Sequence, residues 1–511
     1  MSKKQREKKH SGRGQKLTSP LSSHSRVGKT LVPPMMQMKN ISFQSWSNNR
    51  LPEMLWACLV VSVLPREAAL GAFREISAIG IKYREEQDRP AKGWSLDLSA
   101  LPTQPPEIFE HLVNTVTRHP LGYAALRPLL LLENLPGTEL WRAALATEAS
   151  DDDWRTLGSA VLLTFDHQSQ QATDVRWLRL LFKLGLGELR FPKELTERID
   201  ELIDYPNRGD MRKVRPFIRS SEGALAMFPD GAATNPWPDA FWTECLRRTG
   251  CVPAPPAKRD SQKRDTKAIT RELLDVRKAL LDHHARTITT TGVDAKHDAV
   301  FGFGLFALSC LLELMSGRNG FGITGRLLLR SLTECRISLA YLLRCGDEAM
   351  WVKFRSYGAG QAKLALLKFE EMPEDPTFVE RATLESLANE DFYQEYVQID
   401  LGHWCGKDLR KMAEDSGTKD DYDRIYGWAS GFVHGQWGAL RDSNMTHCLN
   451  PLHRFHRVPL WSHRMMEDAV PDAVGLINSI LDDIDRAYPG FPARFKWKST
   501  DGATVPETSR P

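Results

Sequence analysis

The sequence lacks paired cysteines. None of its eight cysteines belongs to a Cys-x-x-Cys pair, and no spacing of cysteine and histidine matches a zinc finger or a zinc ribbon. Most of them lie inside apolar runs, as Cys310 does in Leu-Ser-Cys-Leu-Leu, which is typical of buried free thiols in a reducing compartment. We therefore expect no disulfide framework, no metal site and no cofactor.

A histidine-rich stretch near the C-terminal end does not change this expectation. It consists of His447, His453, His456 and His463. Because we find no cysteine or carboxylate partner at ligand spacing, we do not expect this stretch to hold a metal ion.

Long hydrophobic runs are also missing. The best candidate, Met54 to Leu64, has eleven residues, whereas a membrane-spanning helix needs about 20. The basic N-terminus is followed by Ser, Gly and Pro rather than by the apolar segment of a secretory signal. We expect no membrane partner and a cytoplasmic location.

The chain has little net charge, but its charge is unevenly placed. The formal charge is +3, and residues 1–30 hold nine Lys or Arg against one acid, so the rest of the chain is near −5. A nucleic-acid-binding body is normally basic, and this one is mildly acidic. The tail, residues 1–44, is too polar to order itself and is predicted to be disordered. It is either an electrostatic anchor for RNA, DNA or ribosomes or, as its lack of interleaved aromatics favours, a solubilising tail.

Alternating apolar and polar residues, the mark of strands, are absent, and helical spacing recurs along the whole chain. The predicted fold is all-α, with an N-terminal helical array and a C-terminal helical bundle. The predicted parts are a basic tail (1–44), a helical domain (45–250), a charged Pro-rich linker (251–267), a bundle (268–495) and a loose end (496–511). In the bundle we predict helices at 266–287, 298–316, 322–344, 348–371, 377–401, 407–414, 422–441 and 465–488.

Two predicted helices of the bundle carry polar residues at spacing four, which places them on one face of each helix. On the first face lie Arg326, Arg330 and Glu334, and on the second lie Tyr426, Ser430 and His434. Glycines 427, 431 and 435 repeat at the same spacing, which allows another helix to approach closely.

These residues carry a resemblance to a bacterial, all-helical family of the domain of unknown function 5677 type, over roughly residues 270–490. The matching motifs are Arg330 with Glu334, then Trp404-Cys-Gly-Lys407 with Met412-Ala-Glu414, and then Tyr426, Ser430, His434 and Gly435. That family is distantly similar to HEPN-type helical bundles, many of which are RNA-cleaving toxins or antiviral defence proteins. The Arg and His spacing that is usual in those nucleases is found at Arg457 and His463, where Pro459 interrupts the helix that the motif needs, so we regard it as a chance match.

The resemblance implies a defence or stress protein whose bundle binds or cleaves RNA without metal. His434 would move the proton of the 2′-hydroxyl, and Arg330 would hold the phosphate. Glu334 would orient either one, and Tyr426 and Ser430 would donate hydrogen bonds. Whether the protein is an enzyme stays open, because these side chains also fit a buried ion pair with hydrogen-bonding neighbours.

The alternative is a non-enzymatic interaction module. In that case the N-terminal domain binds a protein partner and the bundle supports a homodimer. Trp237, Phe241 and Trp242 are the expected anchors of such an interface, provided that they are exposed.

Overall fold

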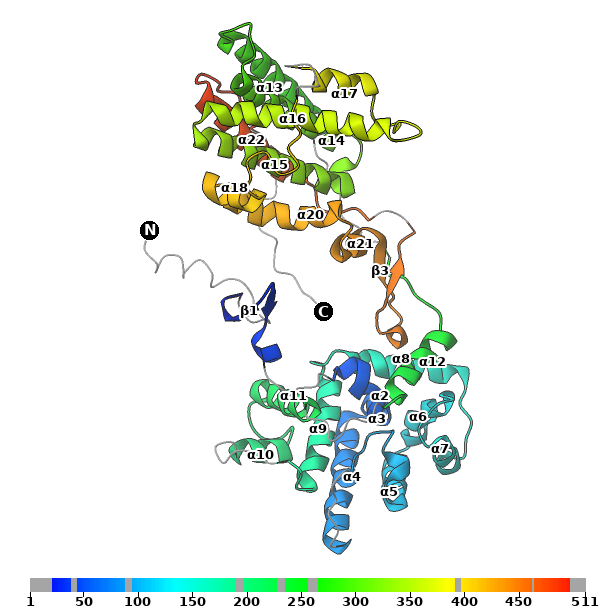
Figure 1. Cartoon of the computed structure of the whole chain (residues 1–511). Coiled ribbons are helices and arrows are strands. Elements are labelled where there is room, and N and C mark those ends of the chain that lie inside the picture. The colour runs from blue at the N-terminus through cyan, green and yellow to red at the C-terminus, as the bar shows by residue number, and fades with distance from the viewer. Residues whose placement is uncertain are drawn as a thin grey trace. The chain divides into compact units, whose positions relative to one another are not determined.

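The structure, a computed structural model, describes residues 21–37, 44–87, 94–189, 196–227, 235–255, 265–390, 397–461 and 464–496. Within these ranges the chain is mostly helical, with two pairs of short strands (Figure 1). The all-α prediction is confirmed.

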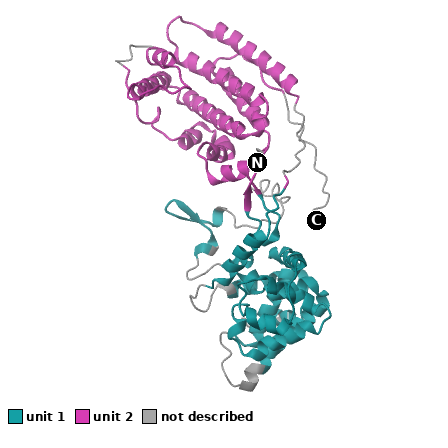
Figure 2. Ribbon diagram, turned by 90° about the vertical axis from the view of Figure 1, so that its right-hand side faces the viewer, with its two compact units in different colours: residues 1–254, 447–456 teal, residues 255–446, 457–511 magenta. Residues whose placement is uncertain are grey.

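The chain divides into two compact units (Figure 2). Unit 1 contains residues 1–254 and 447–456, and unit 2 contains residues 255–446 and 457–511. The boundary after Ala254 falls in the predicted linker, of which 256–264 lies outside the described residues. The return of 447–456 to unit 1 differs from our prediction, which assigned all of 268–495 to the bundle.

Unit 1 is built around a short helix that is apolar on every face. This helix, α3 (Leu55–Val63), is buried from Leu55 to Val60, as expected of a helix with no polar side. It packs against α6, α8 and α9. The elements of unit 1 are η3 (Trp46–Arg50), α2 (Leu51–Glu53), α3, α4 (Arg66–Gln87), η4 (Leu101–Thr103), α5 (Pro106–Thr117), α6 (Gly122–Leu126), η5 (Arg127–Leu131), α7 (Thr138–Leu145), α8 (Asp151–Phe165), α9 (Gln170–Gly185), α10 (Thr196–Ile203), α11 (Met211–Met227), α12 (Trp237–Arg248) and η10 (Pro451–His453).

The aromatic residues expected as interface anchors are part of this core. Trp237, Phe241 and Trp242 are all buried. The two indole nitrogens donate to backbone carbonyls of Pro52 and Asn48. They are therefore not available to a partner, and the anchor prediction is wrong.

The N-terminal tail is only partly within the described residues. Positions 1–20, which hold most of its positive charge, lie outside them. Residues 21–37, predicted to be disordered, contain η1 (Leu21–Ser23), an antiparallel pair formed by β1 (Ser25–Val27) and β2 (Thr30–Val32), and η2 (Pro34–Gln37). Both strands are almost entirely exposed, so this hairpin adds nothing to the core.

Unit 2 is centred on α14 (Ala295–Met315), which packs against its neighbours α13, α15 and α22. A Cβ at Gly304 would lie 2.6 Å from Ile484 Cδ1, so glycine allows the close approach of α14 and α22. The other elements are α13 (Thr266–Thr287), η7 (Asn319–Phe321), α15 (Ile323–Cys345), α16 (Glu348–Glu370), α17 (Arg381–Ala388), α18 (Leu409–Ser416), α19 (Lys419–Asp421), η9 (Tyr422–Tyr426), α20 (Gly427–Val433), α21 (Trp437–Asn444), β3 (Met445–His447), β4 (Arg457–Pro459) and α22 (Val470–Ala487).

Helix α14 is also long and apolar enough to cross a membrane, judged by length and composition alone. Half of its most apolar window is buried inside the structure, and the core helix of a soluble protein passes the same test. Met54 to Leu64, the candidate from the sequence, is shorter and contains the buried helix α3 of unit 1.

Three predicted helices of unit 2 differ from the structure. In 377–401 the described helix is α17, residues 381–388. The single helix predicted at 422–441 is broken after Val433, because Gly435 adopts a left-handed conformation with φ +56°. The helix at 465–488 begins only at Val470.

Candidate functional site

Helix α15 positions the first half of the predicted site. Leu329 and Leu332 are buried and fix the helix in the core of unit 2. This orientation leaves Arg330 and Glu334 half-buried, one turn apart. Arg330 Nη2 lies 3.0 Å from Glu334 Oε1, so the two predicted residues form an ion pair within one helix.

The second half begins in η9, which packs against α15. Arg330 Nη2 donates a hydrogen bond of 3.1 Å to Tyr426 Oη, and the guanidinium lies 5.1 Å from the centre of the tyrosine ring. Tyr426 in turn stacks on Tyr422, with ring centres 4.9 Å apart. Three of the five predicted residues, Arg330, Glu334 and Tyr426, are therefore brought together.

The polar groups of Arg330, Glu334 and Tyr426 do not fully compensate one another. Burial raises the pKa of the Glu334 carboxyl, against the charge of Arg330 and a hydrogen bond from Tyr426, which both lower it. Arg330 Nε is buried and has no hydrogen-bond partner. An orphaned guanidinium nitrogen of this kind costs free energy, so the group is not fully satisfied by its own side chains.

Of the remaining two predicted residues, Ser430 lies in α20 and His434 directly follows its last residue. An eight-residue helical separation corresponds to about 12 Å along the axis, and His434 is the last residue before the break at Gly435. Its side chain is exposed. Among the described residues, no hydrogen bond or ion pair connects Ser430 or His434 with Arg330 or Glu334. The meeting of Arg330 and His434 that the cleavage hypothesis assumed is not found.

The His-Gly motif nevertheless has a clear local role. The N–H of His434 donates to Ser430 O, and the N–H of Gln436 donates to Gly431 O at 2.9 Å. These bonds close the end of α20 around the left-handed Gly435 and allow α21 to start at Trp437. A Cβ at Gly427 or Gly435 would meet nothing within 4 Å, so these glycines do not serve the close helix approach that we predicted.

Two other arginines of α15 bind neighbouring segments of unit 2. Arg326 Nη2 donates to the Glu467 carbonyl at 2.7 Å, and Nη1 donates to the Gly320 carbonyl. Arg336 forms a hydrogen-bonded ion pair with the buried carboxylate of Asp483 on α22. The sequence analysis did not single out this pair, because its members are far apart in the chain.

The remaining predicted motifs are also in place. Trp404 is buried against Phe354, with ring centres 5.3 Å apart. Lys407 pairs with Asp415 at 2.9 Å, and this hydrogen bond raises the pKa of the lysine.

Arg457 lies in β4 rather than in a helix, in agreement with the interruption expected at Pro459. His463 lies outside the described residues.

Comparison with known proteins covers the centre of unit 2. Residues 307–448 match DUF5677, a family of unknown function. The matched segment is less than a third of the chain, yet it contains all five predicted site residues. No curated protein and no solved structure matches the chain.

A second feature, which was not predicted from the sequence, lies on both sides of His434 in the chain. Trp428 and Trp437 are each 62% exposed, and Trp461 is fully exposed. Three arginines accompany them. We call this set the Trp–Arg surface; it consists of Trp428, Trp437, Trp461, Arg441, Arg457 and Arg464.

The Trp–Arg surface is held together by contacts around α21. A Cβ at Gly438 would lie 3.0 Å from the ring of Trp428, so α20 and α21 are in contact there. Leu460 N–H donates to Asn444 O at 2.8 Å, and Arg464 pairs with Asp442 at 3.3 Å. These contacts place the segment around Trp461 beside the C-terminal end of α21.

Arg457 lies near the two other arginines of this surface. The pKa of Arg457 is lowered by burial and by the charges of Arg441 and Arg464. These arginines are not recognisable as one group in the sequence, because β4 and α21 come together only in the folded chain.

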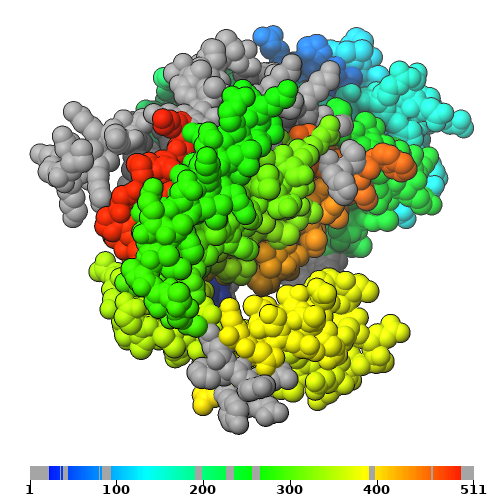
Figure 3. Space-filling view, turned by 90° about the horizontal axis from the view of Figure 1, so that it is seen from above, coloured from blue at the N-terminus to red at the C-terminus, as the bar shows by residue number. Residues whose placement is uncertain are grey.

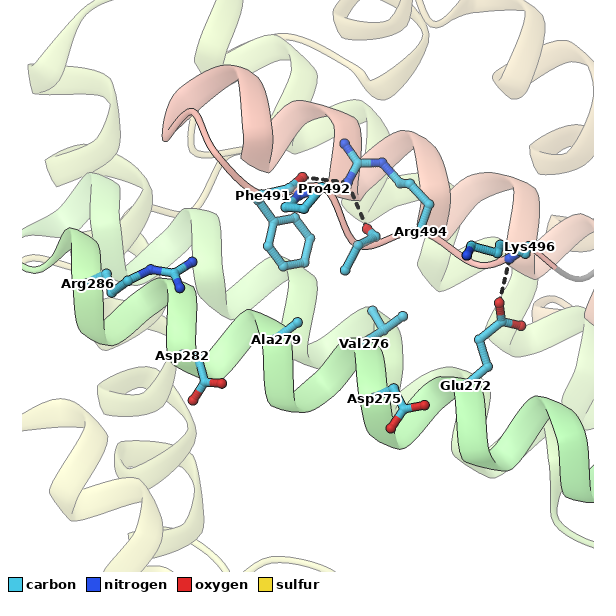
Figure 4. Close-up of a pocket in the computed structure, with 11 residues that line it drawn as sticks. Glu272, Asp275, Val276, Ala279, Asp282, Arg286, Phe491, Pro492, Arg494 and Lys496 are labelled. Carbon is cyan, nitrogen blue, oxygen red and sulfur yellow. Dashed lines mark hydrogen bonds between the residues drawn. The ribbon is translucent and has the colours of Figure 1, made fainter.

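A groove elsewhere in unit 2 contains none of the predicted residues. It has a volume of about 520 Å³ and lies between α13 and the segment after α22. These two segments run side by side on the surface (Figure 3). Val276, Ala279 and Phe491 form its apolar floor, while Asp275 and Asp282 point away from Phe491 (Figure 4). We assign no chemistry to this groove.

Proposed function

We propose that unit 2 binds single-stranded RNA on the Trp–Arg surface. The observation that carries this proposal is the exposure of three tryptophans next to a group of arginines. Large aromatic side chains are normally buried in good part, and a base stacked on each ring would remove it from water. The arginines would bind the phosphates of the RNA.

The position of the Trp–Arg surface supports the same proposal. Trp428, Trp437 and Arg441 lie inside the matched segment, on both sides of His434. The resemblance of the sequence also points to RNA. A distant similarity to HEPN-type bundles implies a bacterial defence or stress protein that acts on RNA, which is consistent with this proposal. A protein partner is the main rival, since Trp and Arg are also frequent interface anchors.

Cleavage of the bound RNA is a second, finer proposal, and it depends on the exposed His434. The imidazole would take the proton of a 2′-hydroxyl, whose oxygen attacks phosphorus. The bond to the 5′-oxygen breaks, and that oxygen takes a proton from water. Because Glu334 and Tyr426 already occupy the guanidinium of Arg330, the arginines of the Trp–Arg surface, rather than Arg330, would hold the phosphate.

Fluorescence anisotropy with a short labelled single-stranded RNA tests the binding proposal. Loss of one stacking partner costs about 1 to 3 kcal/mol, so Trp437→Ala and Trp461→Ala should each raise Kd roughly 5- to 100-fold. Arg464→Ala should reduce the slope of log Kd against log salt by about 1. Phe378→Ala is the matched control, because Phe378 is an exposed aromatic residue between α16 and α17.

Several outcomes would contradict these proposals. Absence of RNA binding by the parent, or equal affinity in the parent and both Trp variants, would remove the binding proposal. Preference for DNA of the same sequence would replace RNA by DNA. For cleavage, the parent should shorten the RNA on a denaturing gel, and His434→Ala should bind it without shortening it. Cleavage that persists in His434→Ala would rule out the role of this histidine.

A further inference from the structure

Two segments of unit 1 that are far apart in the sequence run side by side just beyond α12. Pro253 and Cys448 form an antiparallel bridge. The N–H of Ala254 donates to His447 O at 2.8 Å, and the N–H of Leu449 donates to Val252 O. The first segment follows α12, and the second is the stretch 447–456 that returns from unit 2. This pairing brings cysteines and histidines together that no local spacing connects.

Four potential metal ligands gather where these segments meet. They are Cys251, Cys448, His453 and His456, and their ligand atoms all lie within 4.8 Å of one another. The expectation that the histidine-rich stretch has no cysteine partners is therefore wrong. Cys448 lies five residues before His453, and Cys251 comes from the other segment.

The distances between sulfur and nitrogen atoms match a tetrahedral site. His453 Nδ1 is 3.5 Å from Cys251 Sγ and 3.5 Å from Cys448 Sγ, and His456 Nε2 is 3.4 Å from Cys251 Sγ. Zinc bonds of about 2.3 Å to sulfur and about 2.0 to 2.1 Å to nitrogen give tetrahedral S···N edges of about 3.5 Å. These three edges fit a tetrahedral ion at the centre, and the remaining ligand atoms lie within 4.8 Å of one another.

The ring of His453 is oriented with the required nitrogen toward the sulfurs. Its Nε2 lies 2.9 Å from Thr249 Oγ1. The hydroxyl of Thr249 already donates to Cys245 O, so it accepts from His453. The proton is therefore on Nε2, and Nδ1 presents its lone pair to the cysteines. Metal-binding histidines are typically fixed by such an outer hydrogen bond.

The turn that carries both histidines is strained and firmly anchored. Arg454 and Phe455, between the two histidines, both have positive φ, which is unfavourable for residues other than glycine. Leu452 belongs to the core of unit 1, and Phe455 packs edge-on against Phe165 at 4.8 Å. The N–H of Val252 donates to Cys448 Sγ at 3.3 Å, a bond that a thiolate would strengthen.

We propose that Cys251, Cys448, His453 and His456 bind one Zn²⁺ ion. Two thiolates and two imidazoles favour zinc over magnesium or calcium, which prefer oxygen ligands. Four protein ligands complete the tetrahedral shell and leave no position for a substrate, so the site is structural. On binding, the two thiols lose their protons to solvent. The ion fastens the point where the chain leaves unit 1 to the point where it returns.

Metal analysis of the purified full-length chain is the first test. We expect about one zinc per parent chain, and a strong loss of zinc in Cys251→Ser and His456→Ala. Two control variants should keep the metal: Cys345→Ser removes another exposed thiol, and His447→Ala removes a histidine next to Cys448. Zinc retained at the parent level in both ligand variants would overturn the proposal.

A second measurement uses only the parent chain and is therefore independent of how the variants fold. After removal of zinc with a chelator under reducing conditions, Co²⁺ is added and the visible spectrum is recorded. We expect intense tetrahedral bands with thiolate-to-cobalt charge transfer, which zinc then abolishes. A parent without zinc and without these bands would overturn the proposal. So would a disulfide between Cys251 and Cys448 in mass spectra of chain purified without reductant.

Discussion

Each unit buries a carboxylate, and the comparison between them shows which ion pairs support the fold. In unit 1, Glu222 of α11 is fully buried and meets Arg50, Arg176 and Arg179, the last at 2.5 Å. In unit 2, Asp483 of α22 is fully buried and pairs with Arg336 of α15. In both cases the carboxylate joins separate helices or turns.

The ion pair of Arg330 with Glu334, which was predicted from the sequence, differs from these two buried groups. Arg330 and Glu334 lie on the same helix and keep part of their side chains in water. Their only described partner from another element is the phenol of Tyr426. Buried ion pairs between separate elements are therefore formed by Arg336 with Asp483 and by the Glu222 cluster. Arg330 and Glu334 do not form such a pair.

The largest effect is expected from the Glu222 cluster. Removing one partner of a buried ion pair costs about 3 to 5 kcal/mol, because the other charge stays buried without compensation. Glu222→Ala should lower the free energy of unfolding by this amount in urea titrations. Glu139→Ala is the control, because Glu139 pairs with Arg142 on the exposed surface of α7 and such pairs contribute little. If the two variants have the same free energy of unfolding, the Glu222 cluster does not stabilise the fold.

A buried acid without an arginine should give unit 1 a distinctive pH dependence. The pKa of Glu53 is raised to about 7, mainly by burial and also by the charge of Asp97. The folded state thus holds a proton that the unfolded state has released, and stability falls as pH rises from about 4.5 through about 7. The loss is at most roughly 3 kcal/mol.

The variant Glu53→Gln isolates this contribution. The parent should lose more stability than Glu53→Gln between pH 4.5 and 8, as measured by urea unfolding at several pH values. The two curves should run parallel above about pH 8. If they are parallel over the whole range, Glu53 titrates normally and the carboxyl is not desolvated as the structure indicates.

The local parts of this fold could be predicted from the sequence. Helix α13 has the predicted bounds, because Asp265 accepts a hydrogen bond from the N–H of Ala268 and apolar residues recur at helical spacing. The aspartates 151–153 begin α8, with Ser150 and Asp153 forming a capping box, a pattern that is visible in the sequence. Caps and periodicity act within a few residues, so one sequence is sufficient to find them.

Contacts between distant residues could not be predicted. The partner of Arg336 is 147 positions away. In the proposed zinc site, Cys251 lies before residues 255–446 of unit 2, whereas the other three ligands lie after them. For the candidate site, spacing four correctly placed Arg330 with Glu334 on one face. It failed at His434, because the left-handed Gly435 ends the helix there. Exposure of the tryptophans depends on packing around α21, which composition does not reveal.

The smallest effect is expected from the half-buried pair of unit 2. Arg330→Ala should cost about 1 kcal/mol, since exposed or half-exposed ion pairs contribute about 0 to 1 kcal/mol. Arg336→Ala on the same helix should cost several times more, because it removes the partner of the buried Asp483 that comes from another helix and leaves only Arg486 of α22. Urea unfolding of both variants gives this ratio directly. If Arg330→Ala proves as damaging as Arg336→Ala, the difference between the two pairs disappears, and the Arg330 group is part of the scaffold of unit 2.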